Sequence, residues 1–109
     1  MFSGDTSPSG NLVQLARGAD ILVHEVMDLR LIGRALEFDP RARTLRKHLL
    51  ASHTPMTEVG RIATEAGVKT LVLNHFVPGI VPIPDDIWYD AVKPHFKGRV
   101  IVGRDLMVL

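Results

Sequence analysis

Three side chains able to bind a metal ion lie beside predicted secondary-structure elements of this 109-residue chain. Asp5 lies in a Gly-Asp-Thr loop, His53 just before a predicted helix, and His75 directly after a predicted buried strand. In sheets covered by helices, ligands collect outside the carboxyl ends of the strands. A carboxylate and two imidazoles that converge there would suit zinc, manganese or iron. Spacing alone favours the structural alternative, in which Asp5 forms a turn and each histidine is a hydrogen-bonded structural residue.

The composition limits both the ligands and the partners. The chain has no cysteine, so any metal must be held by nitrogen and oxygen atoms from five histidines and twelve acidic residues. Its formal net charge of +1 gives no general attraction to nucleic acid or to a membrane. The N-terminus lacks the basic and apolar regions of a signal peptide, and no apolar run approaches the roughly 18 residues of a membrane helix. We therefore expect a cytoplasmic protein without membrane contact.

Helices and strands are predicted to alternate, which is typical of an α/β sheet covered by helices. Asn11 is predicted to cap a first helix, a buried strand follows over 20–26, and the range 27–40 fits either a helix or a lid-like insertion. A helix with a basic solvated face is predicted over 44–50, and a second helix is predicted after Pro55, with Thr54 or Thr57 as its cap and Gly67 as its end. A strand over 68–74 and a stiff loop over 78–84 follow. The chain is then predicted to form a helix from Asp85 and two short strands within 99–109. No repeat or linker interrupts the chain, which predicts one domain over residues 1–109.

Motifs in a fixed order resemble those of the metallo-β-lactamase superfamily. The Ser-Gly-Asp-Thr sequence at 3–6 resembles a motif of that superfamily, and the strand over 20–25 resembles the strand that follows it. Ser-His-Thr at 52–54 and Leu-Asn-His-Phe at 73–76 resemble the ribonuclease Z and arylsulfatase-like branch. The resemblance implies an α/β fold that is the C-terminal half of a metallo-β-lactamase-like αββα sandwich, with a mixed sheet covered by helices.

The resemblance also implies a role for each candidate residue. Asp5 matches the aspartate that bridges two metal ions, and His75 matches the last histidine ligand, which binds the second ion. His53 matches a histidine that is not a ligand and instead assists the leaving group or contacts the scissile phosphate, as an imidazole can near neutral pH. The implied cofactor is zinc, two ions in the complete fold, with manganese or iron as alternatives. The metal pair would activate a water for hydrolysis.

Other polar residues receive structural interpretations. For His24 and Glu25, an ion pair or cap at the end of the strand is preferred to a supporting role behind the metal ligands. His48 and His95 match no motif and are predicted to lie on the surface.

The sequence departs from the family in one respect. The main ligand signature, His-x-His-x-Asp-His, is absent, and no His-x-His pair occurs in the 109 residues. Asp5 and His75 provide only two protein ligands, whereas a catalytic zinc site usually has three. We therefore expect a truncated frame, a subcloned fragment or a misassigned start, which is inactive alone. An inner face carrying Val23, Leu71 and Leu73 would need covering by a second copy of the chain or by the missing N-terminal half.

Two functions remain as alternatives. The first is that of a metal-dependent hydrolase of phosphodiester or sulfate-ester bonds, of which this chain is part. The second is that of a non-catalytic half-fold that dimerises or docks onto a partner chain. The motifs do not choose between a small ester and a nucleic acid as substrate. The lack of a visible separate basic arm favours a substrate other than RNA.

Overall fold

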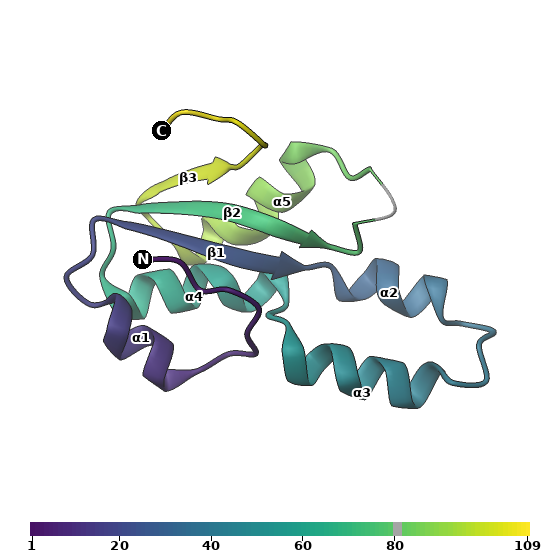
Figure 1. The fold of residues 1–109 in the computed structure, drawn as a ribbon. Helices are drawn as coiled ribbons and strands as arrows, with labels where there is room; N and C mark the ends of the chain where they lie inside the picture. The colour runs from purple at the N-terminus through teal and green to yellow at the C-terminus, as the bar shows by residue number, and fades with distance from the viewer. Residues whose placement is uncertain (80–81) are drawn as a thin grey trace.

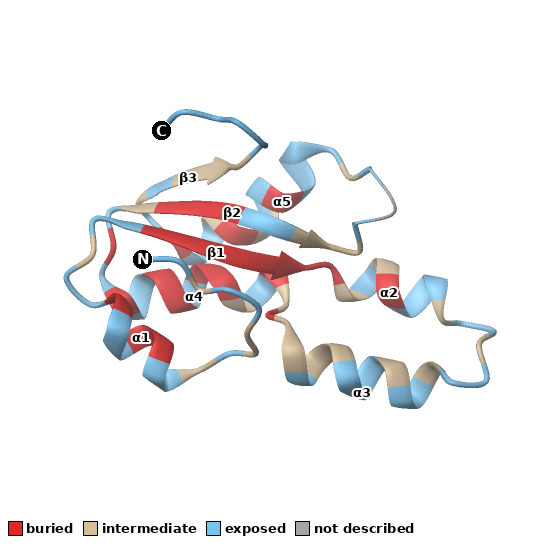
Figure 2. Ribbon diagram, viewed as in Figure 1, coloured by how far each residue is buried: buried red, intermediate tan, exposed pale blue. Residues whose placement is uncertain are grey.

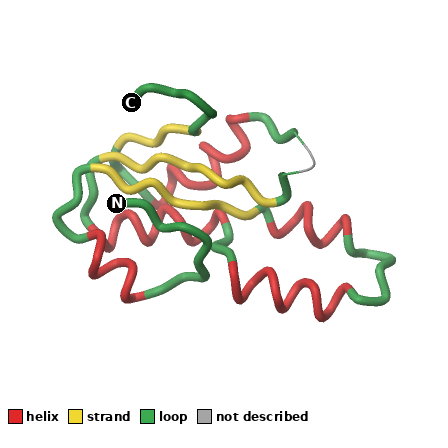
Figure 3. Tube along the Cα trace, in the orientation of Figure 1, coloured by secondary structure: helices red, strands yellow, loops and turns green. Residues whose placement is uncertain are grey.

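A parallel sheet of three strands forms the centre of the fold, and the computed structural model describes residues 1–79 and 82–109 (Figures 1 and 3). The strands are β1 (Ile21–Met27), β2 (Thr70–Val77) and β3 (Arg99–Val102), side by side in that order. The helices are α1 (Gly10–Ala16), α2 (Leu29–Ala35), α3 (Ala42–Ser52), α4 (Met56–Ala66) and α5 (Asp85–Val92), and a short 3-10 helix, η1 (Lys93–His95), follows α5. No helix in the described residues is long and apolar enough to cross a membrane.

The predicted α/β class is confirmed, but the predicted mixed sheet is wrong for the part of the chain that the structure describes. Both strand pairs, β1 with β2 and β2 with β3, are parallel. Helices connect each strand to the next, and a helical crossover returns the chain to the edge of the sheet from which the previous strand started. All three strands therefore end at the same edge of the sheet.

Helices cover one face of the sheet and create the hydrophobic core there (Figure 2). Helix α4 packs against α1, α5 and β1, and it contributes the apolar side that the sequence predicted. Leu71 and Leu73 are fully buried in this core together with Leu22 and Val26 of β1. The prediction that Leu71 and Leu73 lie on an uncovered inner face is therefore wrong. Successive side chains of a strand alternate between the two faces, so the opposite face carries Val72 instead.

The two ends of the chain pair with the strands by backbone hydrogen bonds and border the hollow on that opposite face. Phe2 forms an isolated parallel bridge with Val23, and the amide of Gly103 donates a hydrogen bond to the carbonyl oxygen of Leu73. Val23 and Val72 are consequently only 8% and 5% exposed. Val23 lies on the predicted inner face, but the terminal segments already shield it from solvent.

The helix caps differ from the predictions in their residues. Ser9, rather than Asn11, caps α1 by accepting a hydrogen bond from the amide of Leu12. Pro55 holds the cap position of α4 without a side-chain hydrogen bond, and neither Thr54 nor Thr57 caps this helix. The range 27–40 contains a helix, α2, whose cap is the buried Asp28. The predicted end of α4 at Gly67 is confirmed by its left-handed φ of 70°.

The C-terminal part contains one strand fewer than predicted. Strand β3 ends at Val102, and the described residues 103–109 form no further strand. Strand β2 runs to Val77, three residues beyond the predicted end, so His75 lies inside the strand. The predicted helix from Asp85 is confirmed. The predicted loop over 78–84 includes residues 80 and 81, which lie outside the described residues.

The close approach of α4 to α5 and η1 depends on Gly60. A Cβ atom at this position would lie 2.6 Å from the carbonyl oxygen of Val92 and 3.0 Å from the Cβ of His95. We expect Gly60→Ala to lower the free energy of unfolding by about 1–3 kcal/mol, because backbone must move to relieve the overlap. Urea denaturation followed by circular dichroism measures the change. Gly33→Ala is the matched control, because a Cβ there has no neighbour within 4 Å, and it should leave stability unchanged or raise it.

Candidate metal centre

Asp5, His53 and His75 come together in the folded chain, as the metal-site interpretation of the sequence requires. One possible ligand atom from each residue lies within 4.8 Å of those from the other two. The Oδ1 atom of Asp5 is 3.0 Å from Nδ1 of His75, and the rings of His53 and His75 are 5.6 Å apart between centroids. The side chains of Asp5 and His75 are 61% and 50% exposed, whereas that of His53 is 13% exposed. The cluster is therefore open to solvent on one side and supported by the protein on the other.

A β-bulge in β2 places His75 in this cluster. Glu25 of β1 is paired with Asn74 and Val26 with Phe76, so His75 is an extra residue without a partner in the register. Its φ is 41°, a left-handed conformation that is uncommon for a residue with a side chain. Such bulges change the direction of one side chain and are found next to active sites. The bulge turns His75 toward Asp5 near the end of the strand.

The loop that carries Asp5 is anchored on both sides to β1. Before Asp5, the Oγ atom of Ser3 accepts a hydrogen bond of 3.1 Å from the amide of Glu25. After Asp5, the amide of Thr6 donates a hydrogen bond of 3.1 Å to Oε1 of Glu25. Gly4, with a φ of 62°, makes the turn between the two anchors. Asp5 is thus held near His75 although its own side chain is exposed.

Glu25 holds the loop of His53 with the same carboxylate. The amide of Thr54 donates a hydrogen bond of 2.9 Å to Oε1, and Nδ1 of His53 lies 3.3 Å from Oε2. The hydroxyl of Thr54 donates to the carbonyl oxygen of Thr6 at 2.6 Å, which joins the two loops directly. One carboxylate therefore sets the positions of the segments that carry Asp5 and His53. Thr6 and Thr54 are therefore joined to each other as well as to Glu25.

Burial governs the charge of this carboxylate. Glu25 is 1% exposed, and its burial raises the pKa above the ordinary value of a glutamate. The amides of Thr6 and Thr54 and the nearby His53 favour the ionised form and oppose this rise. The contact between Glu25 and His53 orients the imidazole, because a carboxylate at Nδ1 leaves Nε2 free to face Asp5 and His75 or a substrate. Sequence reasoning preferred a strand-end ion pair for Glu25, and its contact with His53 goes further than that, because it joins the strand to a residue of the cluster.

The donor set fits a zinc-like ion. Two ligands bound at about 2.0–2.1 Å to a tetrahedral zinc lie roughly 3.3 Å apart, close to the 3.0 Å between Asp5 and His75. The donors are nitrogen and oxygen atoms, as zinc, manganese and iron accept. The sequence indicated two ligands, and the structure brings His53 close enough to be a third donor or to act beside the metal.

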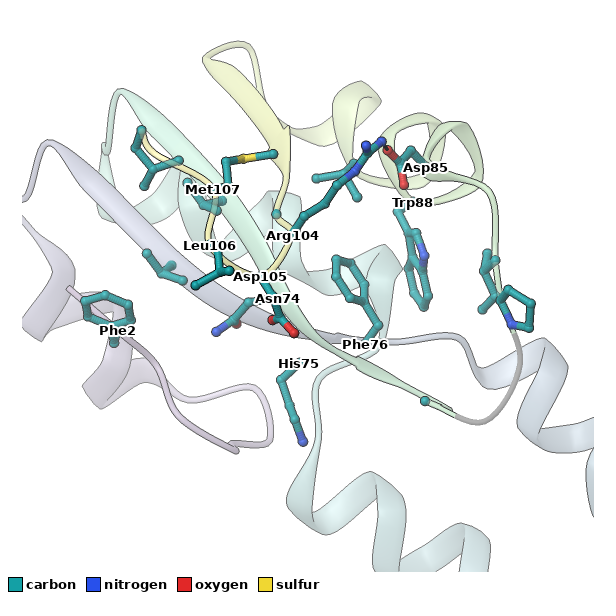
Figure 4. Close-up of a pocket in the computed structure, with 18 of the residues that line it drawn as sticks. Phe2, Asn74, His75, Phe76, Asp85, Trp88, Arg104, Asp105, Leu106 and Met107 are labelled. Carbon is teal, nitrogen blue, oxygen red and sulfur yellow. Dashed lines mark hydrogen bonds and ion pairs between the residues drawn. The ribbon is translucent and has the colours of Figure 1, made fainter.

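A hollow of about 730 Å³ begins at His75 and extends over the open face of the sheet (Figure 4). Its lining includes Asn74 and Val72 of β2, Phe2 from the N-terminal segment, and Leu106 and other residues of the C-terminal segment. Figure 4 shows His75 at one rim of the hollow, with Asn74 beside it. A ligand bound in the hollow would therefore reach the candidate metal centre. The two histidines without a motif, His48 and His95, are exposed, as predicted.

Comparisons with known proteins agree with this arrangement. No family model matches the chain. A putative ribonuclease Z of Mycobacterium tuberculosis is 38% identical over 106 residues, which are 97% of this chain and 45% of that protein. A ribonuclease Z of Mycobacterium marinum is 36% identical over 106 residues, 36% of its length. The metallo-β-lactamase fold protein YhfI of Bacillus subtilis superposes on 94% of this chain and 36% of its own with a TM-score of 0.65 and 24% identity.

These matches confirm the predicted resemblance and the predicted fold. YhfI shows that the chain has part of a metallo-β-lactamase fold, and the mycobacterial proteins show that its sequence is similar to ribonuclease Z along nearly its whole length. The chain spans less than half the length of the relatives that it matches. The roles of Asp5, His53 and His75 stay predictions, because sequence similarity does not test what each side chain does.

The connection made by Glu25 predicts a stability difference between two substitutions. We expect Glu25→Ala to lower the free energy of unfolding by roughly 2–4 kcal/mol, because the amides of Thr6 and Thr54 lose their acceptor. Glu25→Gln keeps an acceptor oxygen and should cost markedly less. Chemical denaturation of both variants measures the difference, with the partly exposed Glu58→Ala as control at about 1 kcal/mol or less. Equal losses for Glu25→Ala and Glu25→Gln would show that the charge, rather than the acceptor, holds the loops.

The buried His24 should make the stability of the fold depend on pH. Its side chain is fully buried, Nδ1 donates to the carbonyl oxygen of Glu25 at 2.7 Å, and burial lowers its pKa below 6.5. As the pH falls below 6.5, the unfolded chain binds a proton that the folded chain excludes, so stability present at pH 7 is lost. The loss from this group is at most about 1.4 kcal/mol per pH unit.

Denaturation of the wild-type chain and of His24→Leu at pH values between about 5 and 7 isolates this contribution. The variant should show a weaker loss of stability in acid than the wild type. His48→Gln, which changes an exposed histidine, should keep the dependence of the wild type. Identical pH profiles for the wild type and His24→Leu would contradict the assignment.

Proposed function

From the premise that this chain is a homologue of ribonuclease Z with part of a metallo-β-lactamase fold, we propose that it forms one half of a metal-dependent phosphodiester hydrolase and supplies part of its metal ligands. The observation that carries the proposal is the meeting of Asp5, His53 and His75 at the end of the sheet. Three residues from distant parts of the chain provide oxygen and nitrogen donors within 4.8 Å of one another. Neither the hydrophobic core nor the sheet requires this arrangement, since all three side chains lie outside the core.

In this proposal the three residues divide between metal binding and proton transfer. Asp5 and His75 would hold the metal, and the 3.0 Å between Oδ1 of Asp5 and Nδ1 of His75 would allow both to bind one ion. A bound divalent metal would lower the pKa of a water and stabilise negative charge on the ester oxygens. His53 donates a proton to the leaving oxygen, and Glu25 orients its ring through the contact at Nδ1. Glu25 is a positioning residue in this scheme, because its carboxylate is buried behind His53.

The names of the relatives favour a phosphodiester over a sulfate ester. The mycobacterial proteins that match nearly the whole chain carry the name ribonuclease Z, which denotes cleavage of RNA. We therefore revise the sequence-based preference for a substrate other than RNA.

The proposal requires a second polypeptide segment. Asp5 and His75 are too few ligands for a catalytic zinc, which usually has three protein ligands and a water. The relatives are more than twice as long as this chain, so a segment equivalent to their remaining part would supply the other ligands and cover the hollow over the sheet. A second copy of the chain is the alternative source. Location in the cytoplasm stays a prediction.

A non-catalytic half-fold remains the second candidate. The observation that favours it is the exposure of Asp5 and His75, which leaves the candidate centre open to solvent within the described residues. Water competes with ligands and screens charges at an exposed centre, and hydrolases usually enclose the reacting groups. Binding and turnover measurements separate the two candidates.

A zinc titration by calorimetry on the metal-free chain tests the proposed site. We expect binding near one zinc per chain, or per dimer, in the wild type. His75→Ala and Asp5→Asn should weaken it at least about tenfold, because each removes one ligand. His53→Ala should keep most of the affinity if His53 acts in proton transfer. His48→Ala changes an exposed histidine far from the cluster in sequence and is the matched control.

Each alternative has its own outcome in this titration. Weak binding that His75→Ala leaves unchanged would overturn the metal site. Loss of binding in His53→Ala would make His53 a ligand instead of a proton donor. Tight binding without turnover of a nitrophenyl phosphodiester, even after a segment equivalent to the remaining part of the relatives is added, would favour the non-catalytic half-fold. Zinc-dependent turnover that is lost in His53→Ala would support the hydrolase.

A further inference from the structure

Helices α2 and α3 with the loop between them form an arm, residues 29–52, that projects beyond the carboxyl edge of the sheet (Figure 1). The arm starts two residues after β1 ends at Met27, and it finishes at Ser52, directly before His53. Its root is therefore fixed beside the candidate metal centre, since Glu25 lies just before one end and His53 just after the other. Any ligand that the arm holds near its root lies close to His53.

The positive charge of the protein is concentrated on this arm. Residues 29–52 contain six of the 13 lysine and arginine residues and two of the 12 acidic residues, a net charge of +4. The whole chain has a net charge of +1, so the remaining residues carry −3. The net charge of the whole chain is near zero, which argued against a nucleic-acid partner. This sum combines a basic arm with an acidic remainder of the chain.

Most of these charges have no intramolecular partner. Arg30 pairs with Asp28 and Arg41 with Asp39. The other four basic residues of the arm are exposed and form no ion pair within residues 1–79 and 82–109: Arg34, Arg43, Arg46 and Lys47. Three of them, Arg43, Arg46 and Lys47, lie within five consecutive residues of α3. Unpaired charges at this density repel one another, which costs stability unless an anion binds.

The arm contributes little to the core, so stability does not explain its composition. Helix α3 has no buried residue, and Ile32 is the single buried residue of α2. At the tip, in the loop between the two helices, Phe38 is 92% exposed. An exposed aromatic ring beside basic residues is the combination with which proteins bind single-stranded nucleic acid, by stacking a base and pairing phosphates. A membrane-binding helix would instead present a broad apolar face, and Leu45 and Leu49 of α3 are half-buried.

We propose that the α2–α3 arm is a docking surface for single-stranded RNA that leads into the metal centre. Arg43, Arg46 and Lys47 bind successive phosphates, and Phe38 stacks on a base at the tip. The choice of RNA rests on the proposed function, in which RNA is the phosphodiester cleaved beside His53. Binding by the arm is separate from cleavage, because no arm residue belongs to the Asp5, His53 and His75 cluster.

Fluorescence anisotropy with a labelled single-stranded RNA of about 16 nucleotides tests the arm, in the presence of EDTA so that no metal-dependent cleavage occurs. The variant combines Arg43→Gln, Arg46→Gln and Lys47→Gln. We expect its affinity at low salt to fall about tenfold or more. We also expect the slope of log affinity against log salt to decrease by about 2, since each phosphate contact on a single strand contributes about 0.7.

A matched control removes the same charge from the other edge of the sheet. Arg17, Lys97 and Arg99 are exposed and lie near the amino ends of β1 and β3. Their combined change to glutamine should alter the RNA affinity less than about threefold. The general electrostatic attraction between protein and RNA falls equally in both variants, but only the arm variant loses direct phosphate contacts. Phe38→Ala should weaken binding about fivefold or more, and Phe38→Trp should restore it, because stacking needs an aromatic face.

Three results would overturn the proposal. Equal losses in the arm variant and the control variant would mean that the arm is a solvated face. RNA binding unchanged in the arm variant, together with lost sedimentation on phosphatidylserine vesicles, would mean that the arm contacts membranes. Equal affinity of Phe38→Ala and the wild type would remove the stacking contact. Asp5→Asn is expected to leave RNA affinity in EDTA unchanged, so failure of the metal centre and failure of the arm are distinguished.

Discussion

The Glu25 carboxylate connects the parts of the chain on which the candidate site depends. It is buried at the end of β1 and accepts hydrogen bonds from two loops that are 48 residues apart at Thr6 and Thr54. Burial of a carboxylate is costly unless its oxygens have donors, so the two amides must stay in place for the carboxylate to be tolerated. The same requirement keeps Asp5 and His53 near each other. A polar group that is expensive to bury thereby specifies the geometry of its surroundings.

The sheet supplies the second constraint on the site. Parallel strands end at one edge, which brings the end of β1, the end of β2 and the loops after them together. A regular β2 would point Asn74 and His75 to opposite faces, because side chains alternate along a strand. The bulge removes one step of this alternation, so His75 can face Asp5 while Phe76 still packs beside Trp88 in the core. The left-handed backbone of His75 is a local cost that packing on both sides of the bulge can offset.

The sequence predicted the members of the cluster more accurately than it predicted their support. Asp5, His53 and His75 were identified because each belongs to a short motif, and the order of these motifs can be read directly from the sequence. The role of Glu25 was underestimated, because its partners at Thr6 and Thr54 are distant in sequence and a buried glutamate beside a histidine has no local pattern. The caps at Ser9 and Pro55 differed for a related reason. Thr54 could have capped α4, but its hydroxyl bonds to the carbonyl of Thr6 instead, and tertiary contacts override local preferences.

The hydrophobic core and the candidate site lie on different faces of one small fold. The helix-covered face holds the core, and α4 at its centre packs against four other elements, α1, α5, η1 and β1. The open face holds the hollow, and the carboxyl edge holds the cluster with the arm beside it. Neither the arm nor the exposed pair of Asp5 and His75 adds much buried apolar surface, so selection for folding alone would not maintain them. In the proposed function, the basic arm would hold a polyanionic substrate beside the oxygen and nitrogen donors, and a metal bound there would stabilise charge on one of the phosphates.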